Sequence, residues 1–429
     1  MSGCATANIG HEHARWPPAT STRWPLVFLA IFAGASGALC LGKVPAVLGI
    51  LRSELGLTLV EASYLASAFN TLAILFSLFL GLLLTRWSGR QTGVVGLLVI
   101  VAGGALALPA TGLAMMLLSR IVEGIGFLLV SVAMPAFIVA VTREEDKRLA
   151  ISLWAVNLPL GAAAGMLLTP WLTAQGGWRL AWLILMIPQL SALLLLLASR
   201  SADKLRVWAP QNSINSGHPL RQLTVLRQKA LWRYGLAFTL YSLMLWALFV
   251  WLPTMLQGSP GIGQSQIALL SALAVVANIP GNLMGAWLLC RGVARDRLIS
   301  WALGLMALCG MLAFWPGLSP WWAYGLCLAL SLAGGMAPPA ILSSAQGVSQ
   351  GPVQLAIVQG FFVQLANFGQ LLGPLLLAAL MTDSGHWGSA RWLFLGGLLL
   401  VALLYAAGHL PGSSQAAKQA RSHSRQDGR

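Results

Sequence analysis

The sequence contains few charged residues and very few acidic ones. Only 9% of its 429 residues are Asp, Glu, Lys or Arg, and only 11 residues are acidic. Soluble domains carry about a quarter charged residues, so this composition excludes an ordinary soluble protein. Five cysteines are present without metal-binding or redox spacing: Cys4, Cys40, Cys290, Cys309 and Cys327. We therefore expect neither a metal site nor a cofactor.

Two motifs of energy conversion and proteolysis are also missing. The phosphate-binding pattern Gly-x-x-x-x-Gly-Lys-Ser/Thr does not occur, and neither does the zinc-protease pattern His-Glu-x-x-His. The first absence excludes ATP hydrolysis by this chain, and the second excludes the common metalloprotease chemistry. We expect the protein not to be an enzyme.

Twelve long apolar stretches dominate the chain, and hydrophobic residues make up 57% of it. A helix needs about 20 apolar residues to cross the hydrocarbon core of a bilayer. Because lipid cannot hydrogen-bond an exposed backbone, each stretch is expected to be a helix. The predicted spans are residues 25–47, 61–84, 92–110, 113–141, 149–173, 178–199, 231–256, 265–290, 297–315, 320–343, 354–381 and 391–410. The sequence thus predicts an all-α membrane protein with twelve transmembrane helices.

The basic residues of the loops are distributed unequally between the two sides of the membrane. With a cytoplasmic N-terminus, 21 of them fall on the inner side, and only Arg52, Arg179 and Arg391 fall on the outer side. The positive-inside rule then places both termini in the cytoplasm. The net charge of +15 fits contact with anionic lipid headgroups, so no nucleic-acid partner is expected. We predict a protein of the bacterial cytoplasmic (inner) membrane.

A polar, basic segment at residues 200–230 divides the spans into two groups of six. The pattern Gly161-x-x-x-Gly165 of the fifth span returns as Gly369-x-x-x-Gly373 in the eleventh, 208 residues later. Parallel repeats of this kind build a central site between two halves in several transporters. The predicted domains are an N-terminal cytoplasmic tail (1–24), a six-helix bundle (25–199), a cytoplasmic linker (200–230), a second six-helix bundle (231–410) and a disordered cytoplasmic tail (411–429).

Two segments carry a resemblance to a known family. Residues 81–90, Gly-Leu-Leu-Leu-Thr-Arg-Trp-Ser-Gly-Arg, resemble the loop motif Gly-x-Leu-Ala-Asp-Arg-x-Gly-Arg-Arg of major facilitator superfamily transporters, with Thr85 at the acidic position. Residues 120–126, Arg-Ile-Val-Glu-Gly-Ile-Gly, resemble the pattern Arg-x-x-Gln-Gly-x-Gly of the fourth helix in that family. The general appearance is also similar to the cyanate/nitroimidazole-type branch. The resemblance implies the major facilitator fold of two pseudo-symmetric six-helix bundles.

The leading hypothesis is a secondary active transporter that moves a small solute by alternating access. The small excess of buried basic groups favours an organic or inorganic anion, and coupling to protons is expected. Two alternatives remain open: efflux of drugs or toxic compounds by the same fold, and a non-transporting solute sensor on the same scaffold. The expected partners are a small-molecule substrate, protons and the lipid bilayer, and the protein is expected to be a monomer.

Three ionisable side chains within spans are the strongest site candidates, because such groups are costly in a membrane. Arg120 lies about 10 Å from the outer end of the fourth span at 1.5 Å per residue, and Glu123 follows on the same helix face. The pair either faces the central cavity, with Glu123 carrying the coupled proton, or is a permanently ionised pair that locks the span to a neighbour. Lys43, near the outer end of the first span, either meets an anionic substrate or reaches out to the headgroups.

Uncharged candidates and a gating group complete the predicted site. Polar or aromatic side chains at mid-membrane are candidates for substrate contact or coupling, with interhelical hydrogen bonding as the alternative: Asn70, Asn157, Tyr241, Trp246, Asn278, Gln364 and Asn367. The cytoplasmic loops after the second and eighth spans are expected to act in gating through Gly81, Arg86, Arg90, Arg291 and Arg295. We expect the first of these loops to dock against a neighbouring helix end, where backbone carbonyls favour cations.

Overall fold

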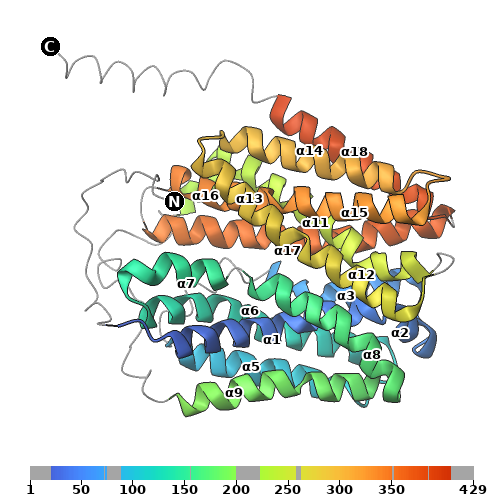
Figure 1. Ribbon diagram of the computed structural model, residues 1–429, viewed down its shortest axis with the longest axis horizontal. Coiled ribbons are helices and arrows are strands. Elements are labelled where there is room, and N and C mark those ends of the chain that lie inside the picture. The colour runs from blue at the N-terminus through green and yellow to red at the C-terminus, as the bar shows by residue number, and fades with distance from the viewer. Residues whose placement is uncertain are drawn as a thin grey trace.

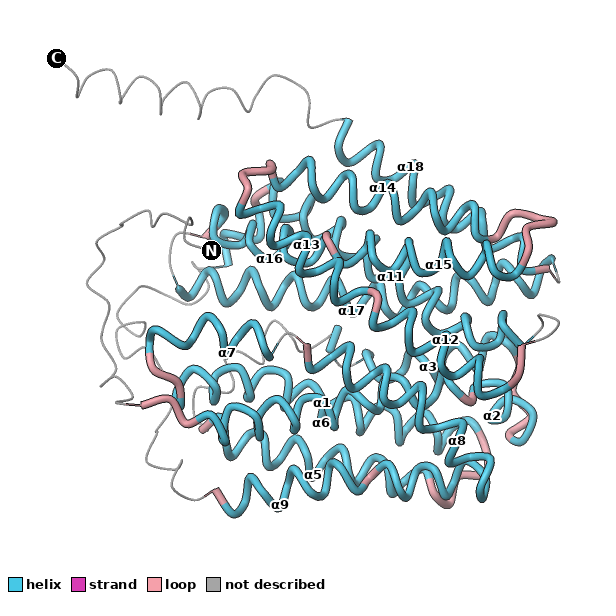
Figure 2. Tube along the Cα trace, in the orientation of Figure 1, coloured by secondary structure: helices cyan, strands magenta, loops and turns pink. Residues whose placement is uncertain are grey.

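The computed structural model describes residues 21–71, 73–74, 88–154, 156–199, 223–257, 262–349, 352–384 and 386–406. These residues are almost entirely helical and contain no strand. Figure 2 shows long helices that run side by side, with most connecting loops at the two ends of the molecule. The predicted all-α class is confirmed.

The helices fall into two sets along the chain. The first set comprises α1 (Trp24–Ala46), α2 (Leu48–Glu54), α3 (Leu59–Ser67), η1 (Ala68–Asn70), α5 (Gly89–Ala107), α6 (Leu113–Val141), η3 (Glu144–Asp146), α7 (Lys147–Trp154), α8 (Asn157–Leu185) and α9 (Ile187–Ala198). The second set comprises η5 (Leu223–Arg227), α11 (Lys229–Gln257), α12 (Gln264–Val276), α13 (Asn278–Cys290), α14 (Arg295–Ala313), α15 (Pro320–Gly335), α16 (Ala337–Val348), α17 (Pro352–Ser384), η6 (Trp387–Ala390) and α18 (Arg391–Ala406).

Ten helical stretches of the described residues are long and apolar enough to cross a membrane. One of them, residues 157–198, contains two predicted spans, because the helix is interrupted at Gly176 and Gly177. Gly177 has φ +78°, a conformation that favours glycine. Figure 1 shows α8 and α9 as neighbouring helices of the same bundle. The second predicted span begins in α3 and η1 and continues beyond the described residues. The ten stretches are therefore compatible with twelve spans.

The two sets form two bundles packed against each other (Figure 1). Helices α1, α5, α6, α8 and α9 lie together in the lower half of the view, whereas α11 and α13 to α18 lie in the upper half. Within their bundles, α1 packs mainly on α8 and α6, and α11 packs mainly on α17. The predicted linker, residues 200–230, is described only from Leu223 onward.

The predicted glycine repeat is a repeat of helix packing. A Cβ atom at Gly161 would lie 2.2 Å from the carbonyl oxygen of Ala35, and one at Gly369 would lie 2.2 Å from that of Thr239. Because glycine has no side chain, α8 can pack closely on α1, and α17 can pack equally closely on α11. The glycines are 208 residues apart and their partners 204, so both halves use the same helix–helix contact.

Candidate functional site

The three ionisable candidates within spans form one buried charge cluster: Lys43, Arg120 and Glu123. The Glu123 carboxylate accepts hydrogen bonds from the Lys43 ammonium through Oε1 and from the Arg120 guanidinium through Oε2. The exposed fractions of these residues are 2%, 0% and 0%. A carboxylate from α6 is thus held between a cation of its own helix and a cation of α1.

Protein groups replace water around both cations. Arg120 also donates a hydrogen bond to the carbonyl oxygen of Cys40, at 2.9 Å. Its guanidinium lies 4.7 Å from the ring centroid of Phe69, and the Lys43 ammonium lies 4.6 Å from that of Trp182. Such cation–π contacts gain strength when the ring and the cation are both out of water. The cluster is therefore enclosed by side chains of several helices.

The position of Glu123 depends on small residues in the neighbouring helix. A Cβ atom at Gly103 would lie 2.7 Å from Glu123 Cγ, and one at Gly104 would lie 3.5 Å from Glu123 Oε1. These two glycines of α5 leave the space in which the glutamate stands. The three-residue spacing of Arg120 and Glu123 places both on one face of α6, and α1 supplies the lysine across the bundle.

The cluster holds an excess of positive charge. With all three side chains ionised, two cations face one carboxylate, and the net charge is +1. Among the described residues, no second carboxylate bonds to either cation. The Arg120 Nε atom is buried without a hydrogen-bond partner in that part of the chain. An unbalanced buried cation is costly, so this arrangement favours a negatively charged partner.

Two expectations for these residues are changed by the structure. Lys43 does not reach out to the headgroups, because its ammonium is bonded to Glu123 inside the bundle. The Arg120–Glu123 pair exists, but it is enclosed within the bundle rather than exposed to a central cavity in this conformation. In this conformation the Arg120–Glu123 pair of α6 is joined to α1 through Lys43.

The C-terminal bundle buries a neutral polar cluster instead. Tyr241 on α11 donates a hydrogen bond to Asn278 Oδ1 of α13 at 3.4 Å. Asn278 Nδ2 donates to the carbonyl oxygen of Ser331 on α15 at 3.0 Å, and Asn282 donates to Asn278 Oδ1 at 2.8 Å. Three helices of this bundle are thus joined by uncharged groups, as expected for interhelical hydrogen bonding.

Among the described residues, the remaining polar candidates make no hydrogen bond to either cluster. Asn157 and Asn367 donate to backbone carbonyls of their own neighbourhood, Trp154 at 2.6 Å and Val363 at 2.8 Å. Asn70 is buried at the end of η1, and Gln364 is partly exposed. Trp246 packs edge-on against Phe249. The sequence therefore named more candidates than the structure gathers into one place.

Sequence reasoning missed two residues beside the charge cluster. Gln189 of α9 is buried and donates to the carbonyl oxygen of Ser36 at 2.8 Å. Its Nε2 atom also lies 3.8 Å from Cys40 Sγ. Trp182 covers Lys43. The available signal was Gln189 itself, which with Ser191 is one of two polar residues in an otherwise apolar helix. A polar side chain within a span usually faces the interior of the protein.

Arg90 is the gating candidate whose contacts are described most fully. Ser88 caps the start of α5 by accepting a hydrogen bond from Gln91 N at 3.1 Å, and this turn presents Arg90 to the end of α9. Its Nε and Nη2 atoms donate to the carbonyls of Leu196 and Leu197, both at 2.8 Å. The first turn of α5 thus docks on the C-terminus of α9, where carbonyls favour a cation.

The other gating candidates are less informative. Gly81 and Arg86 lie outside the described residues. In the second half, the Arg291 guanidinium stacks 4.2 Å from the ring centroid of Trp287. Arg295 begins α14, and a Cβ atom at Gly347 would lie 3.4 Å from its Nη1 atom. The two halves therefore use their loop arginines differently.

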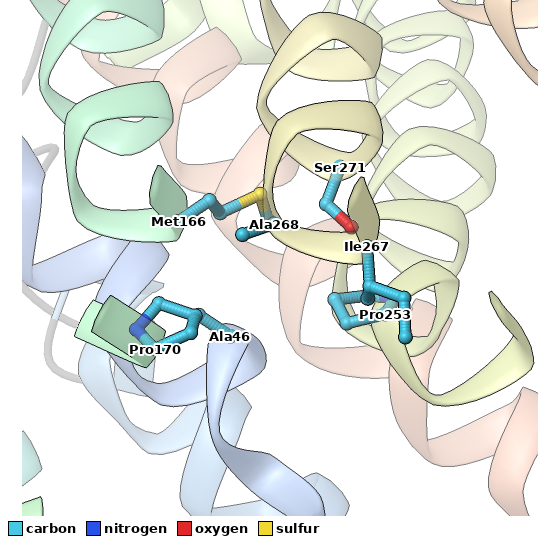
Figure 3. Close-up of a pocket in the computed structure, with 7 residues that line it drawn as sticks. All are labelled: Ala46, Met166, Pro170, Pro253, Ile267, Ala268 and Ser271. Atoms are coloured by element: carbon cyan, nitrogen blue, oxygen red, sulfur yellow. The ribbon is translucent and has the colours of Figure 1, made fainter. Parts of the chain in front are cut away.

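The bundles meet closely near the ends of α1 and α11 at Ala46 and Gln257, which we call the outer end. An outer seam forms there between two sets of residues: Ala46, Met166 and Pro170 from the first bundle, and Pro253, Ile267, Ala268 and Ser271 from the second. Figure 3 shows these side chains facing one another across the seam. These seven residues leave no space for a water molecule between them, so the two bundles are in close contact at this point.

One hydrogen bond between the bundles is described, and it lies on the same side of the molecule. Ser63 of α3 donates to the carbonyl oxygen of Pro374 on α17 at 3.3 Å. Trp251 of α11 donates to the same oxygen at 3.1 Å. The Pro374 carbonyl thus connects both bundles near the outer end.

A short serine motif in the second half has a spacing that also occurs in hydrolases. Residues 347–351 read Gly-Val-Ser-Gln-Gly, the spacing of a nucleophile elbow between a strand and a helix. Here Ser349 follows the end of helix α16 instead of a strand, and its hydroxyl donates to the carbonyl oxygen of Ala345 at 2.7 Å. The required local structure is absent at Ser349, which gives no support for nucleophilic catalysis.

Comparison with known proteins places this architecture in a family. The sequence profile of the Major Facilitator Superfamily matches residues 26–367. The chain belongs to the major facilitator superfamily. It is an integral membrane protein of a transporter family, as the resemblance in the loop motif and in α6 predicted. A search among curated protein sequences finds no significant match.

Solved structures of major facilitator transporters share the fold. A bacterial homologue of the human lysosomal transporter Spinster, in an inward-facing and unoccupied conformation, is 14% identical with a TM-score of 0.69, over 89% of this chain and 96% of that chain. A peptide transporter in complex with alafosfalin is also 14% identical, with a TM-score of 0.72, over 89% and 94%. At this identity the similarity establishes the fold alone, and the cyanate-type branch stays a prediction.

Proposed function

We propose that this protein is a secondary active transporter that moves a small anion across the bacterial cytoplasmic membrane by alternating access. Both termini lie in the cytoplasm in this proposal, so the outer seam faces the outside. The buried charge cluster carries the proposal, because its net charge of +1 needs an anion for balance. A cationic drug would meet repulsion there, which disfavours the efflux alternative.

The conformation supports one half of an alternating-access cycle. Packing of the outer seam and the Ser63–Pro374 hydrogen bond both lie at the outer end. In the proposed cycle this end is closed here, and the bundles rock against each other to open it. The seven seam residues are apolar except for Ser271, and none of them is charged. Opening the bundles at the seam therefore breaks no ion pair among these residues.

Coupling to protons is assigned to Glu123. In the ionised state its carboxylate balances one cation and holds both Lys43 and Arg120. A proton on Glu123 removes that charge and leaves two cations without a counter-ion, which an anionic substrate then supplies. Proton and monovalent anion therefore arrive together, and the net charge buried in the bundle stays at +1 during transport. The coupling step is a local charge exchange that biases the two bundle arrangements.

Reconstitution separates transport from sensing. A thermal-shift screen of small anions on the purified protein first selects ligands that raise its melting temperature. Proteoliposomes are then loaded with each ligand, and exchange with external radiolabelled ligand is measured with and without a pH gradient. The transporter proposal predicts protein-dependent exchange, and accumulation when the external side is acidic. A ligand that stabilises the folded protein but never crosses would support the sensor alternative instead.

A further inference from the structure

A pocket at the outer end of the C-terminal bundle lies apart from the charge cluster and from the outer seam. It has a volume of about 600 Å³ and lies between the loop after α14 and the start of α18. Its lining combines aromatic and apolar residues with two basic side chains, among them Phe314, Trp315, Leu318, His386, Ser389 and Arg391. Ligand pockets commonly have volumes of about 300–1,000 Å³, so this outer pocket is large enough for a small organic group.

Arg391 brings a positive charge to the outer pocket. Its guanidinium lies 5.8 Å from the ring centroid of Trp315 and 5.1 Å from that of Trp392. Within the described ranges, Arg391 makes no hydrogen bond and no ion pair. Its N–H donors, which match the oxygens of a phosphate, are therefore available to a ligand.

The corresponding corner of the N-terminal bundle is closed by the protein itself. Arg179 follows the turn between two spans as Arg391 does, and it donates to the carbonyls of Leu108 at 3.1 Å and Ala110 at 2.9 Å. Its guanidinium also lies 4.0 Å from Glu54. The arginine of the first half is thus engaged by the preceding loop and an acid, whereas the arginine of the second half borders an open volume.

Tryptophans place the outer pocket at the level of the lipid headgroups. Trp315, Trp322 and Trp392 are exposed to 56%, 72% and 54% and stand around this end of the bundle. Tryptophan concentrates at membrane interfaces, where its ring meets both lipid and water. A phosphate group at this depth in a bilayer belongs to a lipid headgroup.

We propose that the outer pocket binds the phosphate headgroup of an anionic phospholipid from the outer leaflet. Arg391 donates to the phosphate oxygens, Ser389 lines the polar side of the pocket, and the glycerol and upper acyl carbons lie against Phe314 and Leu318. The bound lipid would hold the loop after α14 against η6, the same junction that Arg179 closes with its own hydrogen bonds in the first bundle. The proposal concerns a lipid site and does not depend on the transported solute.

Native mass spectrometry on the full chain tests this site. The protein is purified in mild detergent with added phosphatidylglycerol, and retained lipid is counted per molecule. We expect Arg391→Gln to lose one retained phosphatidylglycerol and Arg391→Lys to keep part of that binding. Arg52→Gln is the matched control, because Arg52 lies at the outer end of the first bundle, donates to the Leu57 carbonyl and does not line the outer pocket. It should retain lipid as the parent protein does.

Two further arms keep the result decisive. Leu318→Trp fills the pocket while keeping Arg391, and it should also lose the lipid. Glycerol 3-phosphate is tested as a soluble source of the same phosphate chemistry. If excess lipid displaces the retained phosphatidylglycerol and glycerol 3-phosphate does not, the result supports a lipid site. Stabilisation by glycerol 3-phosphate with no lipid retained would overturn the lipid assignment, and so would equal retention by the parent protein and a folded Arg391→Gln.

Discussion

The N-terminal bundle buries charges where the C-terminal bundle buries uncharged residues. When the shift of the glycine repeat is applied, Arg120 corresponds to Leu328 and Glu123 to Ser331, both 208 residues later. Lys43 corresponds to Ala247, at the shift of 204 found for the partner helices. The backbone carbonyl of Ser331 accepts a hydrogen bond from Asn278. The two halves thus share their packing but not their chemistry, and the proposed charge-dependent step lies in the first half.

The same comparison predicts that substitutions of buried polar residues destabilise the two bundles to different extents. A buried ion pair that loses one partner leaves an uncompensated charge, at a cost of about 3–5 kcal/mol. A polar hydrogen bond between membrane helices contributes about 1 kcal/mol or less. The first bundle therefore stands to lose far more from a single substitution in its polar interior than the second.

The largest effect on stability is expected from Glu123→Gln. This variant leaves Lys43 and Arg120 buried with no negative charge, so we expect a loss of about 3–5 kcal/mol and a clear fall in melting temperature. Lys43→Met leaves the Arg120–Glu123 pair electrically balanced and should cost much less. Adding Lys43→Met to Glu123→Gln should recover part of the loss. If the two single substitutions lowered the stability equally, and the double variant lost the sum of both, the three charges would not compensate one another.

The glycine contacts should respond equally in both halves, with a smaller effect. Gly161→Ala and Gly369→Ala each bring a Cβ atom to 2.2 Å from a backbone carbonyl, so the helices must separate. Overpacking of this kind costs about 1–3 kcal/mol, read as a fall in melting temperature. Gly304→Ala, where the new Cβ meets nothing within 4 Å, is the control and should be neutral or stabilising. A large effect in one half only would contradict a shared packing.

Arg90→Ala is expected to slow turnover with little change in substrate affinity. It removes two hydrogen bonds to the end of α9, a helix-end interaction of about 1 kcal/mol. If this contact stabilises one gate conformation, the exchange rate in proteoliposomes should fall roughly fivefold, as 1 kcal/mol implies. Arg90→Lys should restore part of the rate. A large rise in KM with normal turnover at saturation would argue against a gating role.

The smallest effect is expected in the neutral cluster of the second bundle. Asn278→Leu removes the hydrogen bonds to Tyr241 and Ser331 and should cost about 1 kcal/mol or less. Because no charge is involved, the dependence of transport on the pH gradient should be unchanged. Loss of that dependence in Asn278→Leu would move the coupling step into the second half and break the comparison.

Sequence patterns predicted the elements better than the contacts between them. Apolar runs predicted the helices because bilayer thickness fixes their length, and the spacing of Arg120 and Glu123 predicted their pairing because it follows helix periodicity. The contribution of Lys43 could not be assigned, since 80 residues separate it from Glu123 and only the packing of α1 on α6 brings them together. Likewise, glycines in α5 make the room for Glu123, which no local pattern shows.

The most direct test of the account is pH-driven uptake by Glu123→Gln in proteoliposomes. The uptake of the anion chosen by thermal shift is measured with the external side acidic, and its exchange is measured without a gradient. We predict that Glu123→Gln still exchanges the anion across the membrane but no longer accumulates it, because a glutamine amide cannot gain or lose a proton. Asn278→Leu should retain both exchange and accumulation. Unchanged pH-driven accumulation in Glu123→Gln would contradict the coupling role and leave the charge cluster as a structural lock.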